Sequence, residues 1–145
     1  PNLIPRTEKC AAVQLSTPED FKGNWKQSFP GYQQLHVELG CGKGRFTAET
    51  AALCPDVLLV AIEKVPDAMV VAMERVCEMG LPNTRFMDRD VVKLPEIFEK
   101  GEAGTPNIVS LPPIFCGNMQ MSSLLAARFI SKPITRPCSP GLWSR

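Results

Sequence analysis

The chain has little of what holds metal ions or crosses membranes. His36 is the only histidine, and none of the six cysteines belongs to a CxxC pair, so we expect no zinc or other metal site and give His36 a structural role. No apolar run approaches the roughly 20 residues that span a bilayer, and the N-terminal sequence PNLIPRTEK has no apolar signal core. These absences argue against a metal centre and a membrane partner, and we interpret the chain as cytoplasmic.

Length and composition are those of an ordinary globular protein. The 145 residues are enough for one domain with its own core, and 44% hydrophobic with 21% charged residues is not a disordered composition. A net charge of +1 argues neither for nor against nucleic acid as a partner. We divide the chain into an N-terminal extension (1–34), an α/β half-domain (35–104) and a tail (105–145) that is rich in proline and has no acidic residue.

The central part alternates apolar runs with helical patterns, which is typical of a parallel sheet with flanking helices. One apolar run, VLLVAI, is apolar almost throughout, as expected of a central parallel strand covered on both faces. The pattern predicts strands at Leu35–Leu39, Val57–Ile62 and Thr84–Met87, helices at Phe46–Cys54 and from Pro66 to a stop at Gly80, and a helical turn at Leu94–Phe98.

A glycine-rich turn, Gly40-Cys41-Gly42-Lys43-Gly44-Arg45, joins the first strand to the first helix. The dinucleotide fingerprint GxGxxG needs its third glycine where this chain has Arg45, which disfavours a nicotinamide-dependent oxidoreductase. A phosphate loop of the Walker type is excluded because the residue directly after Lys43 is neither Ser nor Thr. The spacing GxGxG with Glu38 just before it instead resembles the first motif of S-adenosylmethionine-dependent methyltransferases. Lys43 and Arg45 are interpreted as solvated turn residues.

Acidic residues stand at the ends of all three predicted strands. Glu63 closes the second strand, and its two carboxylate oxygens can accept both hydroxyls of a ribose. Asp90 follows the third strand and can reach the adenine end of the same ligand, with Asp88 as a competing acid. Without these acids, the glycine turn could simply be a tight strand–helix connection. Together with Glu38, they favour a cofactor site.

The longer sequence segments around these residues resemble the bacterial tRNA (guanine-N7-)-methyltransferase family. The resemblance covers about residues 5–104 and is carried by PEDFKGNW, VELGCGKGRF, PDVLLVAIEKVPDAMVVAMERV and LPNTRFMDRDVVKLPEIFEKGE. It implies a Rossmann-like class I methyltransferase fold, S-adenosyl-L-methionine as cofactor and tRNA as partner, with methyl transfer to N7 of a guanine in the variable loop. The cofactor-binding positions it implies are Glu38, Gly40, Gly42, Gly44, Glu63 and Asp90.

The resemblance ends at Gly104. The family continues with an Asp-Pro-Trp-Pro-Lys strand, whose aspartate is its proposed catalytic residue, and with a basic tRNA-binding run. This chain has neither, so its catalytic residue is unknown. The genetic code allows the gene for Thr105 onward, when translated in a shifted reading frame, to encode a sequence similar to the family's next segments. We therefore hypothesise a frameshift near Gly104. We therefore expect a fold that is incomplete in its C-terminal half, a partly disordered tail and a truncated, inactive methyltransferase. The alternative is a non-catalytic fragment that binds S-adenosylmethionine or a protein.

Overall fold

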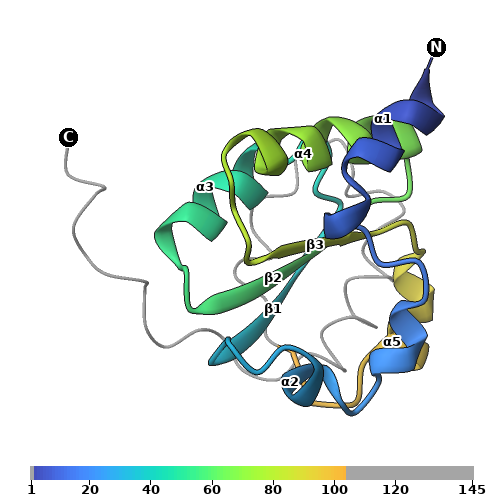
Figure 1. The fold of residues 1–145 in the computed structure, drawn as a ribbon. Helices are drawn as coiled ribbons and strands as arrows, with labels where there is room; N and C mark the ends of the chain where they lie inside the picture. Colours follow the sequence, from blue (N-terminus) through green and yellow to red (C-terminus); the bar gives the residue numbers. More distant parts are fainter. Residues whose placement is uncertain (1, 104–145) are drawn as a thin grey trace, which may run out of the picture.

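The computed structural model describes residues 2–103, which form a three-stranded parallel sheet with helices on both faces (Figure 1). The strands are β1 (Gln34–Leu39), β2 (Val57–Ile62) and β3 (Thr84–Met87), in the order β1-β2-β3. The first strand begins one residue earlier than predicted, and the other two have the predicted bounds. Leu39 pairs with Ile62 and Ile62 with Met87, so all three strands end at one edge of the sheet.

The helices of the predicted α/β unit lie close to their predicted positions. Each strand-to-strand connection contains one helix, α3 (Arg45–Leu53) before β2 and α4 (Pro66–Glu78) before β3. Helix α3 ends before Pro55, because proline disfavours helical backbone at the residue that precedes it. Pro66 occupies the first turn of α4, where its missing N–H has no helical partner to lose. After β3 come a 3₁₀ turn, η3 (Val91–Lys93), and α5 (Leu94–Ile97).

The segment before β1 holds four short helical elements that run over both faces of the sheet. They are α1 (Leu3–Lys9), η1 (Ala11–Val13), η2 (Pro18–Phe21) and α2 (Trp25–Ser28). Helix α1 lies against α4 (Figure 1). Gln14 forms a parallel bridge with Phe86, and the Leu15 N–H donates to the Phe86 carbonyl at 2.8 Å. The segment thus pairs with the outer edge of β3 at one bridge, an arrangement that the sequence pattern did not predict.

Alternation along β2 divides the core into two layers. Leu58, Val60 and Ile62 face one layer and Ala61 faces the other, because successive side chains of a strand point to opposite faces. The first layer is closed by residues from outside the sheet, and the indole of Trp25 stacks on Phe98 there with ring centroids 4.9 Å apart. The second lies under α1, α3 and α4. All six residues of β2 are buried, as the sequence predicted.

Hydrogen bonds from Asn83 join the start of β3 to the connection between α3 and β2. Its side-chain amide is buried and donates to the carbonyls of Ala51, Cys54 and Val57 at 2.9–3.0 Å. A single side chain therefore satisfies three backbone acceptors where a helix ends and a strand begins.

No helix among residues 2–103 has the length and apolar character needed to cross a bilayer. The division of the chain at residues 34 and 104 stays a prediction. The interpretation of residues 105–145 as a partly disordered, non-family tail lies outside the described residues.

Candidate cofactor site at the carboxyl edge of the sheet

The structure brings the three acids of the predicted site to one edge of the sheet. Glu38 is the penultimate residue of β1, Glu63 directly follows β2, and Asp90 comes three residues after β3. Because the three parallel strands end in register, these residues follow neighbouring strand ends. In open α/β sheets, ligands bind outside the carboxyl ends of the strands.

The glycine turn is fixed to the end of β2 by backbone hydrogen bonds. The N–H groups of Gly40 and Cys41 both donate to the Ile62 carbonyl, at 2.8 and 3.2 Å. Gly40, Gly42 and Gly44 have φ angles of 70°, 55° and 70°, a region in which residues with a Cβ are strained. On the outer side of the turn, Arg75 of α4 donates from Nε to the Lys43 carbonyl at 3.2 Å.

Gly42 and Gly44 are surrounded differently. A Cβ added to Gly44 would lie 2.5 Å from the Cβ of Ala72 and 2.8 Å from its Cα, so this glycine allows α4 to pack against the start of α3. A Cβ added to Gly42 would meet no described atom within 4 Å. The two glycines therefore serve different purposes. Gly44 is required by packing, whereas the backbone at Gly42 borders open space that a ligand can approach.

Glu63 is hydrogen-bonded to the backbone of the glycine turn. Its Oε2 accepts the Gly42 N–H at 2.8 Å, and its Oε1 accepts the Val65 N–H at 2.9 Å. Two carboxylate oxygens offer about four acceptor sites. Each oxygen thus keeps acceptor capacity for a further donor, such as one hydroxyl of a ribose.

Glu38 is half-buried and has a fully buried partner. The hydroxyl of Thr47, on the first turns of α3, donates to Glu38 Oε2 at 2.6 Å. Burial raises the pKa of Glu38, the Thr47 hydrogen bond opposes that rise, and the negative charge of Glu63 adds to it. Perturbed carboxyls of this kind cluster at functional sites. No local sequence pattern predicts this role of Thr47, which lies nine residues from its partner.

Asp90 and Asp88 have different surroundings. Asp90 accepts the Val92 N–H at 3.2 Å and pairs with Lys64, which follows Glu63, at 3.0 Å. The Lys64 ammonium lowers the pKa of Asp90. Asp88 is exposed and pairs with the neighbouring Arg89 at 2.9 Å. The contact with Lys64 links Asp90, and not Asp88, to the residues that follow β2.

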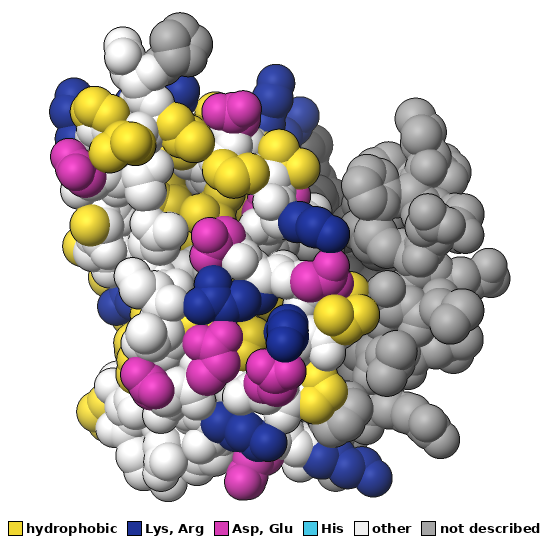
Figure 2. Space-filling model, turned by 90° about the vertical axis from the view of Figure 1, so that its right-hand side faces the viewer, with side chains coloured by type: hydrophobic (Ala, Val, Ile, Leu, Met, Phe, Trp, Pro, Cys, Tyr) yellow, Lys and Arg dark blue, Asp and Glu magenta, His cyan; other side chains and the backbone are white. Residues whose placement is uncertain are grey.

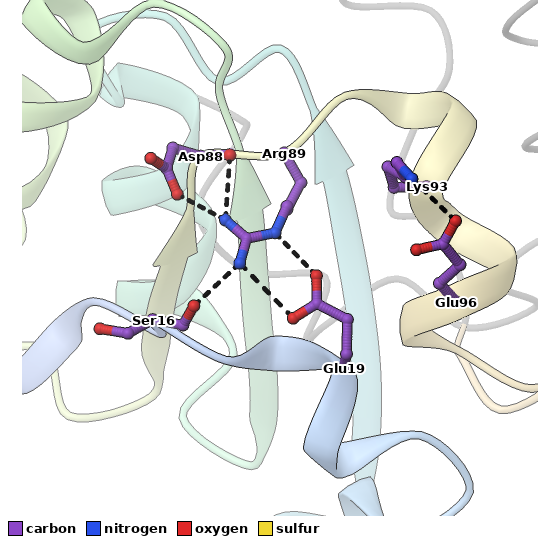
Figure 3. Close-up of polar contacts among 6 residues, drawn as sticks. All are labelled: Ser16, Glu19, Asp88, Arg89, Lys93 and Glu96. Carbon is purple, nitrogen blue, oxygen red and sulfur yellow. Dashed lines mark hydrogen bonds and ion pairs between the residues drawn. The ribbon is translucent and has the colours of Figure 1, made fainter.

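Arg89 fastens the N-terminal segment beside this edge (Figure 3). Its guanidinium donates to the carboxylate of Glu19 at 2.8 and 3.4 Å and to the Ser16 carbonyl at 2.8 Å. The Arg89 ion pair lowers the pKa of Glu19. Figure 2 shows basic and acidic side chains intermixed on the face that it presents, in keeping with ion pairs such as this one. The Arg89–Glu19 contact joins residues 70 positions apart, so no local sequence pattern predicts it.

The remaining candidate residues have structural surroundings. The Arg45 side chain is 83% exposed and pairs with Glu49 one turn along α3, so it is solvated as expected, although it begins α3 and does not lie in the turn. His36 is buried in β1 and contacts Gln34 Oε1 at 3.0 Å through Nε2. Burial lowers the pKa of His36. Within residues 2–103, no three His, Cys, Asp or Glu side chains are grouped so that they could hold a metal ion.

A parallel sheet with a glycine turn after its first strand and acids at successive strand ends defines the Rossmann-like class of nucleotide-binding α/β proteins. Comparison with known families narrows this class. Residues 32–106 match the family described as "Putative methyltransferase". The chain belongs to this methyltransferase family, together with the bacterial tRNA (guanine-N7-)-methyltransferases to which it is similar.

Individual relatives agree with this assignment. Proteins named tRNA (guanine-N(7)-)-methyltransferase share 38% identity over 97 residues in Listeria welshimeri and 34% over 102 residues in Bacillus cytotoxicus. These matches cover 67% and 70% of this chain but 45% and 47% of the relatives, so the chain spans about half their length. A solved structure from Methanococcus maripaludis, described as a "putative s-adenosyl-l-methionine-dependent methyltransferase", has the same fold, with a TM-score of 0.54 and 15% identity. That match covers 90% of this chain and 57% of the solved one.

Proposed function

We propose that residues 35–104 bind S-adenosyl-L-methionine, and that the reaction to which this half-domain belongs is methyl transfer to N7 of a guanine in the tRNA variable loop. The observation that carries the proposal is the set of three carboxylates around the glycine turn, with Glu63 hydrogen-bonded to Gly42. Family membership and the names of the relatives support the cofactor and the substrate class.

The donors and acceptors fit this cofactor. Glu63 keeps one acceptor site on each oxygen for the two ribose hydroxyls. Asp90, beyond the next strand end, is placed to accept from the amino group of an adenine. Glu38, on the other side of Glu63 and held by Thr47, offers an acceptor for an ammonium group. Gly42 leaves the approach to the turn open.

Little covalent chemistry is required of the protein in such a reaction. When bound, S-adenosyl-L-methionine supplies a methyl group on a positively charged sulfur, and guanine N7 is already a nucleophile. The role of the protein is to hold the two in line, which is a proximity effect. We propose that Glu38, Glu63, Asp90 and the glycine turn, with Gly40, Gly42 and Gly44, perform the cofactor half of that alignment.

We further propose that the 145-residue chain binds the cofactor without transferring the methyl group. Residues 105–145 contain neither the Asp-Pro-Trp-Pro-Lys sequence nor the basic run of the resembling family. A non-catalytic fragment that binds S-adenosylmethionine, or a partner protein, is the corresponding alternative function. Turnover by this chain would refute the proposed loss of catalysis while leaving cofactor binding intact.

Calorimetry with the purified chain tests the binding site. We expect S-adenosyl-L-methionine to bind and NAD to bind at least tenfold more weakly. Glu63→Ala is expected to weaken binding by at least tenfold, because both ribose acceptors and the Gly42 contact are lost. Glu96→Ala is the matched control, since Glu96 is an exposed glutamate whose ion pair is with Lys93 in the adjacent turn (Figure 3). Equal binding by the two variants would contradict the site.

A methyl-transfer assay on unmodified tRNA tests the reaction. Radiolabelled S-adenosyl-L-methionine and the chain are incubated with tRNA that has a guanine in its variable loop, and a full-length relative serves as the positive control. We expect label transfer by the relative and none by this chain. Cofactor binding without transfer supports both parts of the proposal, whereas absence of binding would refute the first part.

A further inference from the structure

Two cysteines meet where helix α1 packs on helix α4. Cys10 is the residue that ends α1 and is buried, with 3% of its surface exposed, whereas Cys77 lies in the last turn of α4 and is exposed. Both are free thiols, and Cys77 lies near enough to Cys10 to help raise the pKa of the Cys10 thiol. They are 67 residues apart in the sequence, so only the packing of α1 on α4 brings them together.

A nearby ion pair fixes the register of these two helices. Arg6 of α1 donates from Nε and one terminal nitrogen to both carboxylate oxygens of Glu74 in α4, at 2.7 and 2.6 Å. Cys10 follows Arg6 by four residues and Cys77 follows Glu74 by three. Residues three or four apart share one helical face, so the thiol contact lies one turn beyond the two-point ion pair. A bidentate arginine–carboxylate pair restricts sliding and rotation.

We propose that Cys10 and Cys77 form a modification site that reacts with low-molecular-weight disulfides of the glutathione class and closes into a disulfide between α1 and α4. The exposed Cys77 thiolate attacks one sulfur of the oxidised reagent, forms a mixed disulfide and releases one thiolate. Cys10 then loses its proton to water and attacks the Cys77 sulfur, which releases the second thiolate. Overall, the two cysteines lose two electrons and two protons, and one disulfide reagent becomes two thiols.

Solvent exposure indicates which of the two cysteines reacts first with the reagent and which closes the disulfide. Cys77 is the accessible thiol, and access is required of the sulfur that meets the reagent first. Burial raises the pKa of Cys10 to about 11, so this thiol is mostly protonated at neutral pH and suits the second, intramolecular step, which has no competing reagent. Cys41 provides a contrast inside the same molecule, because it is buried in the glycine turn and burial raises its pKa further.

The bond would fasten a helix that is otherwise weakly attached. None of the seven residues of α1 is buried, so its position depends on the Arg6–Glu74 pair and on the Cys10 end. Helix α4 also contacts the glycine turn, through Ala72 against Gly44 and through Arg75. Oxidation therefore fixes α1 to the helix that supports the turn. This inference is independent of the proposed function.

Peptide mass mapping after treatment with oxidised glutathione tests the proposal. The chain is incubated with the reagent, excess thiols are blocked, and the digest is analysed without reduction. We expect a peptide that links Cys10 to Cys77, unmodified Cys41, and a higher midpoint of thermal unfolding that returns to its original value on reduction. Cys10→Ser is expected to stop at the mixed disulfide on Cys77, and Cys77→Ser to leave Cys10 unmodified.

The opposite pattern would overturn the inference. If the wild-type chain accumulates the mixed disulfide on Cys77 as Cys10→Ser does, the two sulfurs do not meet. If Cys10 is modified as fast in Cys77→Ser as in the wild type, Cys77 is not the entry point. Circular dichroism of both serine variants shows whether they keep the fold, and wild-type mapping decides the question if either does not.

Discussion

Gly44→Ala is expected to destabilise the fold much more than Gly42→Ala, although both glycines belong to the same motif. Each has a positive φ, and placing alanine in that region costs about 1–2 kcal/mol, partly offset by about 0.4–1 kcal/mol from a less flexible unfolded chain. At Gly44 the new methyl also meets Ala72 at 2.5 Å. Overpacking in a tight core adds about 1–3 kcal/mol. We expect totals of about 2–4 kcal/mol for Gly44→Ala and about 1 kcal/mol for Gly42→Ala.

Urea unfolding followed by circular dichroism measures the difference. Both variants should keep the wild-type dependence on urea concentration, so that the shift in midpoint reports stability alone. The Gly44→Ala/Ala72→Gly double variant removes the nearer of the two contacts and leaves the Ala72 Cα at 2.8 Å. We expect it to recover about 0.5–2 kcal/mol of the combined losses of the single variants. Equal costs for the two glycines, or strict additivity in the double variant, would refute the packing role of Gly44.

The same pair of variants separates stability from binding. Gly42→Ala places a methyl group in space that no described residue occupies, so a ligand that approaches the turn there must lose contact. We expect Gly42→Ala to weaken S-adenosyl-L-methionine binding by at least tenfold while the fold remains intact at 25 °C. Unchanged affinity in this variant would mean that the open side of Gly42 is not the side of the ligand.

Two further predictions concern buried polar groups. Asn83→Ala is expected to lower the free energy of unfolding by about 2–4 kcal/mol, because three carbonyls lose a buried donor; a urea midpoint within error of the wild type would contradict this. Glu38→Gln is expected to stabilise the fold at pH 7 and to weaken cofactor binding. Because the folded-state pKa of Glu38 is raised, folding favours its protonated form, and stability is lost as the pH rises from the unfolded pKa through the folded one. The glutamine variant should therefore gain on the wild type as the pH rises past the unfolded-state pKa of Glu38 and match it at more acidic pH, as checked by thermal unfolding across that range.

The sequence predicted the elements whose signals are local. The bounds of β2 and β3, the first-turn position of Pro66 and the succession of strand, turn and helix around Gly40 follow from short patterns of apolar residues, glycine and proline. The acids at the strand ends were placed correctly for the same reason: in-register parallel strands bring their last residues to one edge.

Contacts that depend on tertiary packing could not be predicted in this way. The buried hydrogen bond of Thr47 to Glu38 joins a helix to a strand, and no spacing rule announces it. Gly44 belongs to a recognised motif, but its close partner Ala72 is an unremarkable helix residue 28 positions away. Arg89 stands between two acids in the sequence, yet it also binds Glu19, 70 positions away. In each case the side chain has several possible partners in the sequence. The packing of the helices on the sheet determines which of them it contacts.

The segment before β1 contributes side chains to the core beside the sheet. Trp25 is 1% exposed, lies in the core layer closed by Phe98, and donates from its indole N–H to the Ile97 carbonyl at 2.9 Å. Glu102 in turn accepts the Gly23 and Trp25 backbone N–H groups. Removing the segment would uncover one face of the sheet and leave the Ile97 carbonyl without its buried donor, a cost of about 1–3 kcal/mol for that one group. It would also free Arg89, which directly precedes Asp90. The position of the third acid at the proposed cofactor site therefore depends on residues that the local motifs do not include.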